Sequence, residues 1–252
     1  MNSMKRSLLI ICLLVSLAAS AASPYVNETT RYRVMYKWGL IQKQAGTATL
    51  SIHLEGDRYK ASLVAASAPW ADGIFCVRDT LYSTILKDGF RPVRYHKAAH
   101  EKSDHKDDVV EFSYNGDNVT GQCHRQVFKD GRKTVDQRQT LHATGTTVDM
   151  LSSFYYMRML PFPTWRSGHK HSITIFSGKR KETLTLQYRG VEDVKVDGTT
   201  YRCFHITFIF TGDGGKKTSD DMDAWITTDA SRTAVQLEGK LPVGKVRCQI
   251  IK

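Results

Sequence analysis

Apolar and polar residues alternate with a period of two along much of the chain. The alternation is clear in residues 31–38, 47–54 and 59–63. A β-strand places successive side chains on opposite faces of its sheet, so this period predicts strands with one buried face. The Glu55-Gly56-Asp57 step separates the second run from the third and predicts the tight turn of a hairpin.

Short polar steps separate further strand-like runs. Gly, Asn and Asp tolerate the positive φ values that tight turns require, so each step predicts a turn between antiparallel strands. Residues 80–141 are therefore predicted to form a meander of long strands, and residues 204–210 the most hydrophobic strand face. The steps are Lys87-Asp88-Gly89, Asn115-Gly116-Asp117, Lys129-Asp130-Gly131 and Val196-Asp197-Gly198.

One segment, residues 148–160, departs from the period of two. Its apolar residues recur at mixed spacings of three and four, which is typical of a helix. Thr146 or Thr147 is the expected cap, Asp149 lies in the first turn, and Pro161 ends the helix. Because nearly all of its sides are apolar, we expect it to be buried against the sheet. Residues 69–78 are expected to hold a shorter helix or an irregular crossing.

The pattern as a whole predicts a mostly β fold. We expect one domain, residues 22–252, whose antiparallel meandering strands form a curved sheet or β-roll around the helix near residues 148–160. Hydrophobic residues make up 41% of the chain, enough for a sizeable core, and no low-complexity linker divides it.

The first 21 residues have the features of a cleavable signal peptide. Lys5 and Arg6 precede the apolar run of residues 8–17, and Ala19-Ser20-Ala21 provides small residues for cleavage. The run is about half the ~20 residues that a spanning helix needs, and no later stretch is apolar enough to cross a bilayer. Cys12 lies inside the run, where lipid attachment is not expected. The sequence therefore predicts an exported protein. The periplasm is the preferred location, and secretion from the cell is the alternative.

The chain is basic, and cleavage would leave it so. Loss of Lys5 and Arg6 reduces 36 basic residues to 34 against 25 acidic ones, a net charge of +9. Export argues against nucleic acid as a partner. The charge favours an anionic envelope component, such as a lipid head group or glycan, or an envelope protein. The alternative is that the charge serves solubility alone.

Four cysteines follow the predicted cleavage point. An even number in an oxidising compartment permits two disulfides, with three connectivities. Cys203 and Cys248 are expected to pair only if their sheet faces agree, and buried free thiols are the alternative. Zinc is not expected because no two cysteines have CxxC spacing. The disulfide candidates are Cys76, Cys123, Cys203 and Cys248.

Candidate catalytic and metal-binding residues do not form a known pattern. His96 and His100 would share one strand face about 13 Å apart, too far to chelate one metal unaided. His105, the pair His169 and His171, and the acids Asp220, Asp221 and Asp223 also lack a complete ligand set. No GxSxG elbow occurs. No catalytic residue, cofactor or metal is therefore assigned.

Three segments resemble the family called domain of unknown function 3108. They are residues 78–92, with Arg78-Asp79-Thr80-Leu81-Tyr82-Ser83 and Phe90-Arg91-Pro92; the helix from Asp149 to Arg158; and the run from Ala224 to Asp229 that continues through Arg232, Val235 and Gly244-Lys245-Val246. The similarity covers nearly the whole chain after residue 21. It implies an exported bacterial envelope protein with a β-rich rolled sheet, and it implies no activity. The cysteines are not part of the family pattern.

Three functional hypotheses follow. The preferred one is non-enzymatic binding of a lipid-like, glycan or protein ligand by a curved sheet. The second is an envelope hydrolase that uses acidic residues as acid and base. The third is a structural or assembly factor that binds another envelope protein at a sheet edge.

Overall fold

The structure is a computed structural model that describes residues 25, 27–73, 76–101, 104–240 and 244–251. The predicted signal peptide, residues 1–21 with Cys12, lies outside the described residues and stays a prediction. Within the described part, no helix is long and apolar enough to span a bilayer.

Strands form most of the described chain, as the period of two predicts. The first eight are β1 (Asn27–Trp38), β2 (Ile41–Glu55), β3 (Arg58–Ser67), β4 (Arg78–Leu86), β5 (Arg91–Glu101), β6 (Asp104–Asn115), β7 (Asn118–Lys129) and β8 (Arg132–Thr144). The others are β9 (Thr147–Asp149), β10 (Lys170–Phe176), β11 (Lys181–Val196), β12 (Thr199–Gly212), β13 (Met222–Thr227), β14 (Ala234–Lys240) and β15 (Lys245–Ile251). Three short 3-10 helices, Asp88–Phe90, Phe162–Thr164 and Asp213–Gly215, and one α-helix, α1 (Met150–Arg158), complete the fold.

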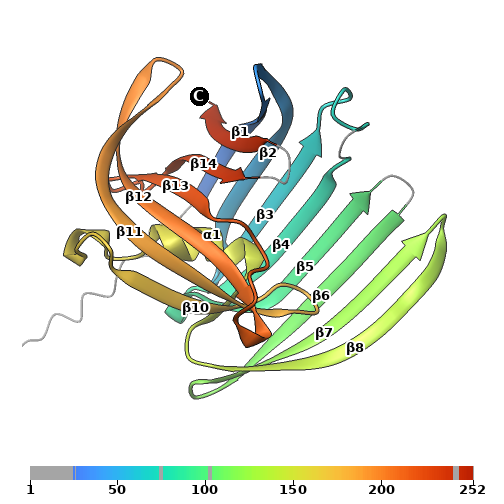
Figure 1. Cartoon of the computed structure of the whole chain (residues 1–252). Helices are drawn as coiled ribbons and strands as arrows, with labels where there is room; N and C mark the ends of the chain where they lie inside the picture. The colour runs from blue at the N-terminus through green and yellow to red at the C-terminus, as the bar shows by residue number, and fades with distance from the viewer. Residues whose placement is uncertain (1–24, 26, 74–75, 102–103, 241–243, 252) are drawn as a thin grey trace, which may run out of the picture.

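All these strands belong to one sheet, which curls into a nearly closed, barrel-like shape (Figure 1). Its order runs from β8 back to β1, crosses to β15, and runs back to β9. Neighbours are antiparallel except β9 and β10, which are parallel. The observed sheet is thus closer to a closed barrel than the predicted curved sheet or β-roll. The crossing from β1 to β15 joins the two ends of the chain, with Arg31 opposite Ile251.

The predicted hairpins and turns are confirmed. The Glu55-Gly56-Asp57 step joins β2 to β3, and the four other polar steps join β4 to β5, β6 to β7, β7 to β8 and β11 to β12. Residues 80–141 form the expected meander within β4–β8. In β12, Phe204, Ile206 and Phe208 are buried. The shorter helix considered for residues 69–78 does not occur in 69–73, which form turns.

Helix α1 lies inside the barrel, in agreement with the burial predicted for residues 148–160 (Figure 1). Its cap differs from the expectation: Asp149, not a threonine, is the N-cap, because the helix begins at Met150, directly after Asp149, and Thr147 lies two residues too early. The Asp149 carboxylate accepts from the backbone N–H groups of Leu151 (2.9 Å) and Ser152 (2.8 Å). Its second oxygen accepts from Ser83 on β4 at 2.6 Å, which ties the helix to the barrel wall.

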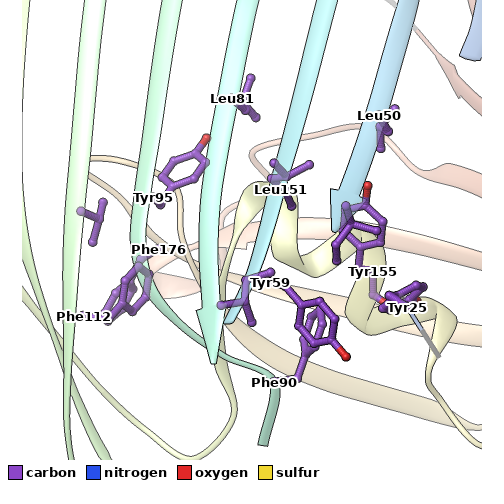
Figure 2. Close-up of a cluster of buried hydrophobic side chains, with 14 of the residues drawn as sticks. Tyr25, Leu50, Tyr59, Leu81, Phe90, Tyr95, Phe112, Leu151, Tyr155 and Phe176 are labelled. Carbon is purple, nitrogen blue, oxygen red and sulfur yellow. The ribbon is translucent and has the colours of Figure 1, made fainter. Parts of the chain in front are cut away.

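The core has two large parts, and α1 contacts both. One part lies against β1–β7 and includes Leu151 and Tyr155 of the helix. Figure 2 shows Tyr155 beside Tyr25, with Tyr59 and Phe90 in the same cluster. The second part lies against β9–β14 and includes Met157. The helix therefore joins the two halves of the barrel from within.

A buried arginine fixes the end of α1. The Arg158 guanidinium donates two bonds to Glu28, at 2.6 and 2.7 Å, and one to the carbonyl oxygen of Arg232 at 2.6 Å. Its side chain is 1% exposed, so these partners replace the water that the charge loses on burial. The residue connects α1 with β1 and with the segment before β14.

Candidate functional site: a basic pocket in the barrel

The turn between β10 and β11 folds back onto the inner face of the facing strands. Phe176 ends β10 and stacks on Phe112 of β6, with 5.6 Å between ring centroids. Gly121 on β7 makes this approach feasible, because a Cβ there would lie 2.6 Å from the Phe176 ring. Figure 2 shows Phe112 and Phe176 together at one side of the core. This aromatic pair holds the turn against β6 and β7.

Polar contacts also hold the β10–β11 turn against β7 and β8. The Cys123 thiol donates to the carbonyl oxygen of Gly178, and the Gln139 amide donates to that of Lys179. Gly178 has a φ of 81°, and a Cβ there would meet the side chain of Asp108 at 3.0 Å. The sheet is open between its edge strands β8 and β9. Near this opening, the β10–β11 turn and the side chains that hold it connect the two sides of the barrel.

A pocket of about 360 Å³ opens beside this turn. Its wall comes from the inner faces of β4–β7, its base from α1, and its rim from the β10–β11 turn. Five basic side chains line it together with two acidic ones. The lining residues are Leu81, Tyr95, Lys97, Ala99, Lys106, Asp108, Arg125, Met150, Ser177, Lys179, Arg180 and Glu182.

The acidic side chains of the pocket have partners within it. Asp108 is buried and accepts two bonds from Arg125, at 3.1 and 3.2 Å. Burial raises the pKa of Asp108, while the charge of Arg125 acts in the opposite direction. Glu182 is also buried and accepts from the Ser177 hydroxyl at 2.5 Å. Both carboxylates therefore hold the pocket wall in place.

The basic side chains at the rim face solvent. Lys179 and Arg180 are exposed in the turn, and the side chain of Lys97 is 40% exposed. Lys97 lies 3.8 Å from Asp79, a long ion pair that leaves its ammonium group open to other anions. Basic groups that converge in a concave recess concentrate positive potential, so the pocket favours an anionic group.

The buried part of the lining also contains apolar side chains beside the two carboxylates. Leu81 and Tyr95 are buried in the wall, and Met150 contacts both core clusters. A recess with basic groups at the rim and apolar groups below suits a ligand that has a charged end and an apolar or ring-shaped body.

Two other cavities have a different character. One, of about 300 Å³, lies near Phe90, Tyr114 and Tyr156 and contains Arg91 as its single basic residue. The other, of about 410 Å³, is lined mainly by threonines and glycines of β8 and β10–β12 and has both Lys181 and Glu182. Neither brings several like charges together, so the basic pocket is the strongest candidate for recognition.

The cysteine candidates remain separate free thiols in the structure. Cys203 lies on β12 and Cys248 on β15, with β13 and β14 between them. Three strand spacings amount to about 14 Å, beyond the reach of a disulfide. Cys203 and Cys248 are therefore too far apart to pair in this structure, where all four candidates are free thiols; their role as disulfide partners stays a prediction. Burial raises the pKa of Cys123 and Cys203 to about 12.

The histidine candidates lie outside the pocket. Asp107 on β6 is contacted by His96 of β5 and by His105 of its own strand, and His105 also packs on His100 with 4.2 Å between ring centroids. No three His, Cys, Asp or Glu residues in the described ranges are placed to hold a metal ion.

The remaining candidates also lie elsewhere. His169 and His171 pack on Trp165, with ring centroids 4.3 and 5.7 Å away. Asp223 accepts from His205 at 2.7 Å, and Asp221 lies 3.4 Å from Lys217. Asp220 is exposed in the same segment.

Sequence reasoning missed the pocket because its residues are distant along the chain. Only Lys179 and Arg180 are neighbours in the sequence, within the short basic run Lys179-Arg180-Lys181. A second signal was present in the sequence. Asp108 lies two residues from buried Val110 and so faces the same side of the sheet, and Arg125 has the same relation to buried Cys123. Charges on the inner phase of two neighbouring strands indicate a polar site inside the barrel.

Comparison with known proteins gives a family and a fold. The model of the family described as "Protein of unknown function (DUF3108)" matches residues 31–250. A β-barrel-like protein of the domain of unknown function DUF1849 from Brucella abortus is similar with a TM-score of 0.58 and 10% identity, over 90% of this chain and 96% of that one. The hypothetical lipoprotein YmcC from Escherichia coli (K12) has a TM-score of 0.34 and 12% identity, over 92% and 88%. No curated protein matches significantly.

Proposed function

We propose that this chain, which belongs to the DUF3108 family of proteins of unknown function, is a non-enzymatic, exported cell-envelope protein. We base its proposed ligand, an anionic lipid-like molecule or glycan, on the geometry of the basic pocket. The observation that carries the proposal is the convergence of five basic side chains on one recess inside the barrel. A phosphate or carboxylate at the rim would meet ammonium and guanidinium donors, which form strong charge-assisted hydrogen bonds.

The lower part of the pocket supports a ligand with more than a charged group. Tyr95, Leu81 and Met150 offer apolar and aromatic contacts below the basic rim. An acyl chain or a sugar ring fits such surfaces. Asp108 and Glu182 are engaged by Arg125 and Ser177, so they orient the basic wall.

Calorimetric titration with two anionic probes tests the proposal. Dihexanoyl phosphatidylglycerol is compared with its zwitterionic phosphatidylcholine counterpart, and a uronate-containing oligosaccharide with a neutral one of equal length. We expect one anionic probe to bind and its counterpart to bind weakly or not at all. The double variant Lys97→Gln/Lys179→Gln should weaken binding by roughly two- to tenfold, as expected for partly exposed charges.

A matched control removes two lysines elsewhere. Lys129→Gln/Lys170→Gln lowers the net charge equally, at exposed positions outside the pocket. Arg125 is left unchanged because its loss would leave the buried Asp108 carboxylate unpaired. Absence of binding by both anionic probes, or equal weakening in the two double variants, would contradict the proposal.

A further inference from the structure

The hairpin tip between β1 and β2 exposes three large apolar side chains. Leu40 is fully exposed, and Trp38 and Ile41 are 56% and 53% exposed. They lie within four consecutive residues, and Gly39, with a φ of 55°, forms the turn between them. Figure 1 shows this dark-blue hairpin projecting at the top of the view, where the chain also ends. Such a cluster at a projecting tip is unusual for a surface that faces only water.

Exposed lysines surround the tip on neighbouring strands. Lys37 and Lys43 flank it on β1 and β2 and are opposite Gln42 and Tyr36. Lys245 on β15 is opposite Lys37, and Lys240 on β14 is opposite Lys245. Four neighbouring strands, β2, β1, β15 and β14, thus place lysines side by side at the end of the barrel that carries the tip.

Acidic side chains of these strands do not offset that charge. Glu28 and Glu55 lie at the other ends of β1 and β2, far from the tip. Glu238 on β14 is engaged by Arg247 at 2.7 Å. β15 contains no acidic residue. The tip therefore combines exposed apolar side chains with uncompensated positive charge.

The base of the hairpin is held firmly. Tyr36, Ala45 and Ala71 form a small buried cluster, and Trp70 packs against it. The Trp70 indole donates to the carbonyl oxygen of Gln44 at 2.8 Å, and its ring lies 4.7 Å from the Lys43 ammonium. The apolar residues of the tip are therefore presented on a supported hairpin.

We propose that this tip docks the protein onto the surface of an anionic phospholipid bilayer. Trp38, Leu40 and Ile41 enter the head-group region, where tryptophan is favoured and aliphatic side chains leave water. The lysines face the negatively charged lipid phosphates, and each contributes attraction that salt screens. Charge complementarity selects the membrane surface as the partner, and this docking is separate from ligand binding in the basic pocket.

Vesicle flotation of the purified protein tests the docking. Vesicles of phosphatidylglycerol and phosphatidylcholine in equal parts are compared with phosphatidylcholine alone. We expect binding to the anionic vesicles only. Trp38→Ser/Leu40→Ser should lower the partition coefficient by about tenfold or more, and Lys37→Gln/Lys43→Gln by about fivefold for each lysine.

Control variants distinguish docking by the tip from non-specific adsorption to vesicles and from binding in the basic pocket. Val64→Ser/Val135→Ser removes two exposed apolar side chains elsewhere, and Lys129→Gln/Lys170→Gln removes two exposed lysines; both should bind vesicles as the unchanged protein does. The pocket variant Lys97→Gln/Lys179→Gln should also retain docking. Unchanged thermal midpoints verify that the variants fold. If the unchanged protein does not bind anionic vesicles, or if Trp38→Ser/Leu40→Ser binds them as well as the unchanged protein does, the proposal is wrong.

Discussion

A single buried carboxylate, Asp149, links helix α1 to the barrel wall. Its oxygens accept from two helix N–H groups and from Ser83, yet it is 0% exposed. Desolvation by burial raises its pKa to about 6, because these hydrogen bonds only partly offset the loss of water. The folded protein therefore favours the neutral form of this carboxyl, which mildly acidic solution populates.

This pKa shift predicts a pH dependence of stability. Between about pH 4 and about pH 6 the folded protein holds more protons at Asp149 than the unfolded chain, so the stabilising contribution is complete below this window and is lost as pH rises through it. We expect the unfolding free energy of Asp149→Asn, relative to the unchanged protein, to rise by about 1 kcal/mol from about pH 5 to about pH 7.5. Urea unfolding at both pH values measures it.

The control for this prediction is Asp117→Asn, which removes an exposed carboxylate in the β6–β7 turn. Its stability relative to the unchanged protein should be the same at both pH values. Asparagine caps helices about as well as aspartate, so the cap itself is retained in Asp149→Asn. A pH-independent difference for Asp149→Asn would show that the carboxyl does not titrate in this window.

At the level of elements, the contact between β7 and β10 depends on a missing side chain. A Cβ at Gly121 would lie 2.6 and 2.8 Å from two ring carbons of Phe176 and 3.2 Å from Val110. We expect Gly121→Ala to destabilise the protein by about 1–3 kcal/mol through overpacking, measured by urea unfolding. Gly73→Ala is the control, because nothing lies within 4 Å of the added Cβ there.

A double-mutant cycle identifies the cause of that loss. Phe176→Leu in the Gly121→Ala background removes the ring that the new methyl group meets. The two substitutions together should cost less than the sum of their separate effects. Strict additivity would mean that Gly121 acts through backbone freedom alone.

The elements themselves were largely predictable from sequence, because their signals are local. Alternation in residues 31–38 and 47–54 corresponds to β1 and β2, and the mixed spacing in 148–160 contains α1. The cap assignment failed because residues 147–149 pair with residues 174–176 as a short parallel strand, which delays the start of the helix to Met150. No local pattern encodes this contact between segments 27 residues apart. The basic pocket was missed for the same reason, since Lys97 and Arg125 meet Lys179 only after the barrel has curled.

Closure of the whole molecule could not be read from the sequence. Among the described strands, backbone pairing stops at β8 and β9, and the β10–β11 turn bridges part of the remaining gap through Phe176, Cys123 and Gln139. Whether a meander stays open or curls depends on such packing between distant residues. The predicted curved sheet or β-roll is therefore refined, at this scale, to a nearly closed barrel.

This architecture predicts an unusual pattern of hydrogen exchange. β1 and β15 are terminal in sequence but each has strand neighbours on both sides, whereas β8 is central in sequence and pairs only with β7. Amides that point away from the neighbouring strand lack a ladder partner and exchange readily. We expect β8 to exchange faster than β1 and β15 in a hydrogen–deuterium experiment resolved by peptide. Slower exchange in β8 than in the terminal strands would place the opening of the barrel between β1 and β15.

The pairing of the first strand with the last also affects how the chain acquires its structure. Every other neighbouring pair in the sheet consists of strands that follow each other in sequence. β1 leaves the ribosome long before β15, because Arg31 and Tyr32 are opposite Ile251 and Ile250, about 220 residues later in the chain. Until Lys245–Ile251 arrives, one edge of β1 presents unpaired backbone groups to other chains. We therefore expect the time between synthesis of β1 and synthesis of β15 to be an interval in which the chain is exposed to aggregation and benefits from a chaperone.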